Sequence, residues 1–122
     1  MPTVLVVEDE WAIADWLHGL LSQEGYQVRL AINGQQALDV MAHGRPDVIL
    51  ADYLMPVMDG PGLLKALAEK PMLARIPVIL MSSLQESSVR ERCDGYQEFL
   101  RKPFREIDVV VAVRNVLKAS KS

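Results

Sequence analysis

The chain has 122 residues, half of them hydrophobic and about a quarter charged, with a formal net charge of -3 at pH 7. This length allows one domain with its own core, and the mild negative charge argues against a general nucleic-acid surface. No apolar run reaches the roughly 18 residues of a membrane span, no signal-peptide pattern opens the chain, and Cys93 has no second cysteine to pair with. We therefore expect a single soluble domain over residues 1–122, in the cytoplasm, with no effector domain in this chain.

The hydrophobic pattern alternates along the chain between short apolar runs and stripes of helical period. The apolar runs predict five strands, at residues 3–7, 26–32, 47–51, 76–81 and 96–100. The stripes predict a helix after each strand, with stops at Gly25 and Gly44 and before Pro71. The last helix is predicted over residues 105–118, and only the tail 119–122 looks loose.

Strands that alternate with helices predict a parallel sheet, because parallel neighbours need a crossover connection and helices supply it. The runs at 3–7, 47–51 and 76–81 carry almost no polar residues, as strands buried on both faces should. The sequence thus predicts an α/β fold: a doubly wound, five-stranded parallel sheet with helices on both faces.

Two of the predicted helices are unusual. The segment 84–93 has a poor helical stripe, so we expect a short, displaced or mobile helix there. The last helix carries two apolar stripes. The first consists of Ile107, Val110, Val111 and Leu117, and the second of Val109, Ala112, Val113 and Val116. Because a helix that is apolar on most sides should be covered on most sides, we expect the second stripe to bind a partner or another copy of the chain.

Polar side chains gather where the predicted strands end. Glu8 and Asp9 follow the first strand, and the third, fourth and fifth strands are followed by Asp52, Ser82 and Lys102. In open α/β sheets ligands bind at the carboxyl ends of strands. Three neighbouring carboxylates repel one another and need a cation or a proton, and their hard oxygens suit Mg²⁺. With a lysine and a hydroxyl nearby, they predict a pocket for a phosphoryl group in which one carboxylate acts as the nucleophile.

Four segments carry a family resemblance: VLVVEDE at 4–10, DVILADYLMPVMDG at 47–60, IPVILMSS at 76–83 and FLRKPF at 99–104. In this order and spacing the chain resembles, over essentially its whole length, a receiver domain of two-component response regulators. The resemblance implies a flavodoxin-like (βα)5 fold with strand order 2-1-3-4-5. It also implies a phosphoprotein that takes a phosphoryl group from a histidine kinase or a histidine phosphotransfer protein of a phosphorelay. Such a domain is not an enzyme, although it takes part in phosphotransfer and in its own dephosphorylation.

The same resemblance assigns the roles at the site. Asp52 is the phosphoacceptor, and it ligates Mg²⁺ together with Asp9. Glu8 acts on the metal mainly through water, and Leu54 supplies its backbone carbonyl. Lys102 pairs with the phosphoryl oxygens, ahead of a bond to proline that the family commonly holds in cis.

For signalling, the resemblance makes Ser82 the switch hydroxyl and Phe99 the switch aromatic. Phosphorylation would change the surface formed by residues 84–93, 96–100 and 105–118. Through this surface the chain would contact a downstream protein or a second copy of itself. No direct contact with nucleic acid or membrane is expected.

Leu54 and Leu84 occupy positions where family members often carry polar side chains that influence the attacking water. With leucine at both positions, we expect the aspartyl phosphate to be shielded from water and long-lived.

Other classes of protein share parts of this pattern. A haloacid-dehalogenase-type phosphatase would need a second Asp where Leu54 stands. A flavodoxin-like FMN binder would need backbone amides and hydroxyls where EDEWA places acids. A receiver fold that works only as a docking module, without accepting phosphate, stays open as a third alternative.

Overall fold

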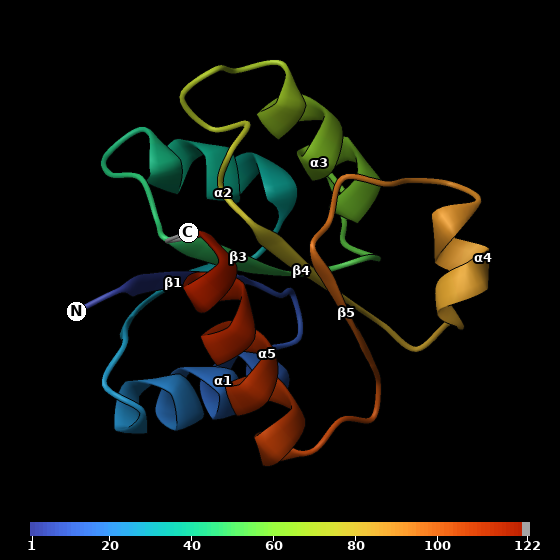
Figure 1. The fold of residues 1–122 in the computed structure, drawn as a ribbon. Coiled ribbons are helices and arrows are strands. Elements are labelled where there is room, and N and C mark those ends of the chain that lie inside the picture. The colour runs from blue at the N-terminus through green and yellow to red at the C-terminus, as the bar shows by residue number, and fades with distance from the viewer. Residues whose placement is uncertain (121–122) are drawn as a thin grey trace.

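The structure is a computed structural model that describes residues 1–120, and it consists of a central sheet with helices on both faces (Figure 1). The strands are β1 (Thr3–Val7), β2 (Gln27–Ala31), β3 (Val48–Asp52), β4 (Val78–Ser82) and β5 (Glu98–Arg101). They are parallel and lie in the order β2-β1-β3-β4-β5. The predicted α/β fold and strand order are confirmed.

The three central strands divide the core into two layers. Every residue of β3 and β4 is buried, and successive side chains point to opposite faces of the sheet. Val4 and Val6 of β1 join the core beneath the two helices of one face, whereas Leu5 and Val7 join the core of the other face. Because both faces are covered, these strands need apolar residues at every position.

Within residues 1–120, four helices have eight residues or more: α1 (Trp11–Gln23), α2 (Gly34–Met41), α3 (Gly60–Ala68) and α5 (Glu106–Ser120). Two of them begin with a side-chain cap. The side-chain amide oxygen of Asn33 accepts a hydrogen bond from the Gln36 N–H at 2.8 Å, and a carboxylate oxygen of Asp59 accepts one from the Gly62 N–H at 2.9 Å. Among residues 1–120, no helix combines the length and the apolar character that crossing a bilayer demands.

The fourth helix, α4 (Glu86–Arg90), has only five residues, so the expected short helix is confirmed. Val89 is its one buried residue. Polar contacts hold the rest: Tyr96 donates a hydrogen bond to Glu86 at 3.1 Å, Arg90 pairs with Glu86 at 2.8 Å, and the Arg90 guanidinium lies 5.1 Å from the centre of the Tyr96 ring. Figure 1 shows α4 beside β5, set apart from the other helices. It is therefore the most lightly packed helix described.

The prediction for the second stripe of α5 is wrong. All four of its residues, from Val109 to Val116, are buried within the chain. Instead, Ile107 and Val111 of the first stripe are exposed, at 53% and 40%. The reason is that α5 packs on the sheet and lies in one core with Leu17 of α1, so that two sides of the helix are covered. The tail prediction is also wrong for residues 119 and 120, which continue α5, and residues 121–122 lie outside the described part.

Candidate functional site

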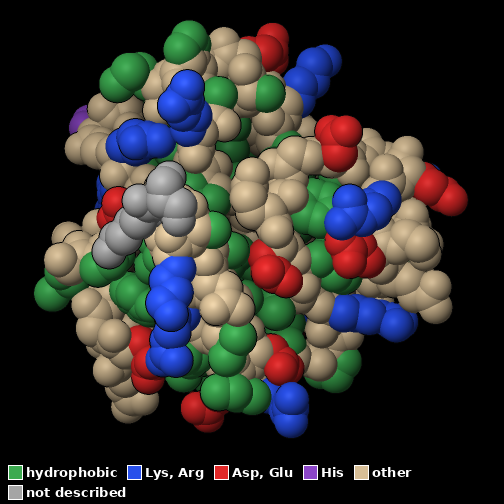
Figure 2. All heavy atoms as spheres, in the orientation of Figure 1, with side chains coloured by type: hydrophobic (Ala, Val, Ile, Leu, Met, Phe, Trp, Pro, Cys, Tyr) green, Lys and Arg blue, Asp and Glu red, His purple; other side chains and the backbone are tan. Residues whose placement is uncertain are grey.

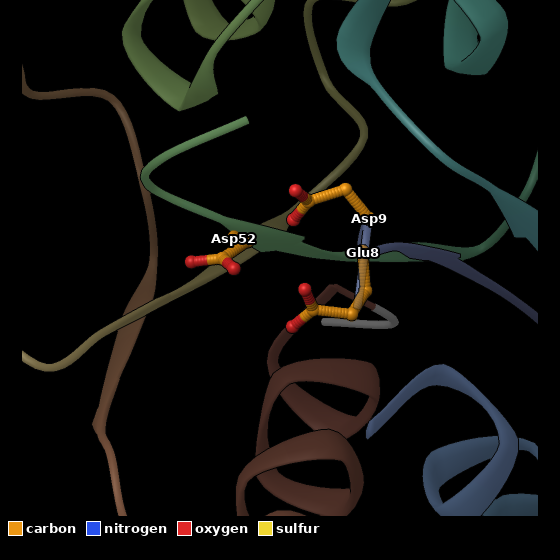
Figure 3. A group of neighbouring side chains, drawn as sticks. All are labelled: Glu8, Asp9 and Asp52. Carbon is orange, nitrogen blue, oxygen red and sulfur yellow. The ribbon is translucent and has the colours of Figure 1, made fainter. Parts of the chain in front are cut away.

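The carboxyl ends of four strands bring the predicted site residues to one edge of the sheet. Glu8 and Asp9 follow β1, Asp52 and Ser82 are the last residues of β3 and β4, and Lys102 follows β5. Figure 3 shows the three acidic side chains around the ends of β1 and β3. One oxygen from each of these carboxylates lies within 4.8 Å of the others. The sheet topology thus assembles the acid cluster that the sequence predicted.

The acid cluster has a buried side and an open side. Glu8 and Asp52 are 1% and 7% exposed, whereas Asp9 is exposed to solvent. A magnesium ion takes oxygen ligands, uses few protein groups and keeps several waters. Carboxylate oxygens that converge beside an opening to solvent fit these requirements.

Lys102 supplies the positive charge of the site. Its ammonium nitrogen lies 2.9 Å from an Asp52 oxygen and 3.0 Å from a Glu8 oxygen. The peptide bond from Lys102 to Pro103 is cis, as the family resemblance implied. The lysine therefore reaches across from β5 and partly balances two buried acids.

Burial changes the acidity of two of these groups. The pKa of Glu8 is raised from its usual 4.5 to about 7. Removal from water is the main cause; the nearby Asp52 also raises the pKa, and hydrogen bonds from the Glu10 N–H and from Lys102 oppose the rise. For Lys102, burial lowers the pKa, but the hydrogen bonds to Asp52 and Glu8 outweigh burial, so that the pKa is raised overall. The ammonium is thus held in its charged form beside the acids.

Ser82 and Phe99 lie on the neighbouring strands β4 and β5. The Ser82 side chain is buried, and its hydroxyl oxygen accepts a hydrogen bond from the Leu84 N–H at 3.0 Å. A serine that accepts one hydrogen bond keeps its O–H to donate to another oxygen. The Phe99 ring is half-buried, 6.2 Å from the Tyr96 ring. The two-position role of Phe99 stays a prediction.

Leu54 and Leu84 present apolar side chains beside the site. They are 63% and 42% exposed, and both line a cavity of about 430 Å³ together with Tyr53 and Asp59. No hydroxyl, amide or carboxylate therefore stands at either position to orient a water molecule.

Sequence reasoning did not assign a role to Met58, although this residue lies in the quoted segment DVILADYLMPVMDG. Its carbonyl oxygen accepts a hydrogen bond from the Gly34 N–H at 2.9 Å. Gly34 lies 24 residues before Met58, and hydrophobic periodicity does not report contacts between such distant segments. The Gly34–Met58 contact thus required the tertiary structure.

The fold and the site together define a class: a doubly wound α/β protein with convergent carboxylates and a lysine at the carboxyl edge of its parallel sheet. The model of the family "Response regulator receiver domain" matches residues 4–114. The chain therefore belongs to the response regulator receiver domains, which serve two-component signal transduction.

Individual relatives agree with this assignment. Sensor histidine kinase TmoS of Ectopseudomonas mendocina is 33% identical over 118 residues, which make up 95% of this chain and 12% of that protein. The signal receiver domain of a signal transduction histidine kinase from Syntrophus aciditrophicus has a TM-score of 0.90 and 35% identity, covering 98% of this chain and 92% of that one. The receiver domain of a sensor histidine kinase from Pseudomonas aeruginosa PAO1, with a magnesium ion coordinated in its active site cleft, has a TM-score of 0.89 and 27% identity, covering 96% and 98%.

Proposed function

We propose that Asp52 accepts a phosphoryl group from the phosphohistidine of a histidine kinase or a histidine phosphotransfer protein. The observation that carries this proposal is the position of Lys102, whose ammonium bonds both Asp52 and Glu8 at the end of the central strands. A cation held there can balance the phosphoryl oxygens as charge shifts during transfer.

In the proposed reaction, one oxygen of the Asp52 carboxylate bonds to phosphorus while the P–N bond of the phosphohistidine breaks. The electron pair of that bond returns to the imidazole nitrogen, which takes up a proton. Lys102 then pairs with a phosphoryl oxygen, and the Ser82 hydroxyl donates to another. Later hydrolysis by water returns Asp52 to its carboxylate, so the chain acts as an acceptor and not as a turnover enzyme.

Mg²⁺ is the proposed cofactor. Asp9, Asp52 and the Leu54 backbone carbonyl would hold it directly, and Glu8 would act mainly through water. When bound, the ion neutralises charge on the phosphoryl oxygens. The proximity of the three carboxylates and the exposure of Asp9 support this assignment.

The surface of α4, β5 and α5 is the proposed output surface, for a downstream protein or a second copy of the chain. Two observations support it. The α4 helix has a single buried residue, and Ile107 and Val111 leave apolar area exposed on α5. Figure 2 shows acidic, basic and apolar side chains interspersed on the visible side of the molecule, without one dominant charge. A mixed surface of this kind suits a protein partner better than a nucleic acid.

The proposal is tested by the intact mass of the protein after incubation with acetyl phosphate and Mg²⁺. We expect one phosphoryl adduct in the wild type and none in Asp52→Asn or in the magnesium-free control. An adduct that persists in Asp52→Asn would contradict the proposal. A wild type that binds Mg²⁺ but gains no phosphoryl group from acetyl phosphate or from a phosphorylated kinase would favour the docking-module alternative.

A further inference from the structure

The loop between β3 and α3 carries the Leu54 carbonyl, and two hydrogen bonds fix its shape. At its base, the Gly60 N–H donates to the Tyr53 carbonyl at 3.0 Å. At its far end, the Gly34 N–H donates to the Met58 carbonyl at 2.9 Å, which ties the loop to the start of α2. Leu54 lies between these two attachments, so the position of its carbonyl depends on both.

The turn at Val57 shows that the loop needs such support. Val57 has φ of +67°, a left-handed conformation that a β-branched residue rarely adopts, and the Met58 N–H donates to the Pro56 carbonyl across it at 2.7 Å. The Val57 side chain is 84% exposed and therefore contributes little packing in return. A backbone in this region persists only when its surroundings hold it.

Met58 supplies that support because it fills the space beside two glycines. A Cβ atom on Gly34 would lie 2.7 Å from the Met58 Cγ, 2.9 Å from its sulfur and 2.9 Å from its carbonyl oxygen. A Cβ atom on Gly62 would lie 3.1 Å from the same Cγ. Methionine thus fits between the first turns of α2 and α3 only because both positions lack a side chain.

We propose that Gly34 and Met58 are positioning residues for the metal site: their contact holds the loop so that the Leu54 carbonyl faces the acid cluster. Neither residue touches the metal, and both act through the loop. This inference rests on the proposed function, since it assumes that Mg²⁺ binds at Glu8, Asp9 and Asp52.

The test is the Mg²⁺ affinity of Gly34→Ala, measured by titration of tryptophan fluorescence, since Trp11 lies two residues after Asp9. Residues that orient metal ligands typically affect affinity by tenfold or more, so we expect the dissociation constant to rise by about tenfold. Gly19→Ala is the matched control, because a Cβ atom on this helical glycine would meet nothing within 4 Å. We expect its dissociation constant to stay within about twofold of the wild type. Equal affinities for the two variants would overturn the inference.

A second variant, Met58→Ala, distinguishes crowding by the Met58 side chain from any other effect of an alanine at position 34. In a Met58→Ala background the side-chain atoms that crowd position 34 are gone, so Gly34→Ala should weaken Mg²⁺ binding less than it does in the wild type. Additive effects of the two substitutions would overturn the inference.

If Gly34→Ala does not fold, Met58→Ala and Met58→Leu decide the matter. We expect a severalfold weaker affinity for alanine and a near wild-type affinity for leucine, and wild-type affinity for Met58→Ala would overturn the inference.

Hydrogen exchange of the metal-free protein separates this inference from the proposed function. Met58→Ala should speed amide exchange in residues 53–60 severalfold while leaving exchange in residues 3–7 unchanged. A wild type that binds no Mg²⁺ would refute the metal site itself, whatever the exchange rates. A wild type that binds Mg²⁺ while the exchange and affinity of Met58→Ala are unaltered would refute only the positioning role.

Discussion

The carboxyl edge of the sheet is built in two different ways. Around β1 and β3, Glu8 directly follows one strand and Asp52 ends the other, and both strands are covered on both faces. Around β4 and β5, α4 rests on one buried residue, Val89, and on polar contacts at the surface. Chemistry requires side chains that are held firmly, whereas a signalling change requires a region that moves at low cost. The two regions meet these two needs separately.

The largest expected effect concerns Lys102, which follows β5 and bonds Glu8 and Asp52 of the firmly held region. Lys102→Ala should slow phosphorylation by acetyl phosphate at least about a hundredfold, because Asp52 would lose the ammonium that lies 2.9 Å from one of its oxygens. Mg²⁺ binding should persist, since the acids remain. The rate is measured by intact mass against time, with Lys65→Ala on α3 as the control. Phosphorylation of Lys102→Ala at the wild-type rate would remove the lysine from the mechanism.

A matched pair of buried valines tests the difference in packing. Val6 of β1 and Val89 of α4 are both 0% exposed. Val6→Ala should lower the free energy of unfolding by about 2–3 kcal/mol through lost burial and a cavity in the core. Val89→Ala should lower it by less than about 1 kcal/mol, because α4 can open without unfolding the sheet. Urea denaturation measures both values, and equal losses would contradict the proposed difference between the regions.

The leucines at the border of the two regions are predicted to lengthen the life of the phosphorylated state. Replacing both, as Leu54→Asn with Leu84→Glu, should shorten the half-life of the aspartyl phosphate by roughly tenfold, because polar side chains can orient the attacking water. Loss of the phosphoryl adduct is followed by intact mass after removal of acetyl phosphate. A half-life equal to that of the wild type would show that shielding by Leu54 and Leu84 does not control hydrolysis.

The smallest expected effect is the pH dependence that Glu8 gives to stability. Burial raises its pKa from 4.5 to about 7, so between these values the folded state holds a proton that the unfolded state has released. The contribution of Glu8 to the free energy of unfolding therefore falls as pH rises through this window and is level above it. In metal-free buffer, the Tm of the wild type minus that of Glu8→Gln should drop by a few degrees from about pH 5 to about pH 8. A constant difference would contradict the raised pKa.

Much of the fold could be predicted because strands that are buried on both faces appear in the sequence as continuous apolar runs. The predicted strand 3–7 matches β1, and the predicted strands 47–51 and 76–81 overlap β3 and β4. The acid cluster and Lys102 followed from the rule that parallel strands end at one edge. In the structure Lys102 bonds Glu8 and Asp52, and oxygens of Glu8, Asp9 and Asp52 lie within 4.8 Å of one another. Their roles in phosphoryl transfer stay predictions.

The features that could not be predicted depend on tertiary contacts. The two apolar stripes of α5 indicated that two sides of this helix are buried. The sequence did not reveal that α1 of the same chain packs in one core with α5. The Gly34–Met58 contact joins segments 24 residues apart and leaves no periodic signal. Local patterns report which side chains are buried, and they do not report what buries them.

The most direct test of the proposed function is to locate the phosphoryl group chemically. Borohydride reduces an aspartyl phosphate to homoserine, which marks the modified residue in a peptide map. We expect homoserine at position 52 alone after treatment with acetyl phosphate and Mg²⁺, and none without the metal. Homoserine at position 9 or elsewhere, with Asp52 unmodified, would contradict the assignment of Asp52 as the phosphoacceptor.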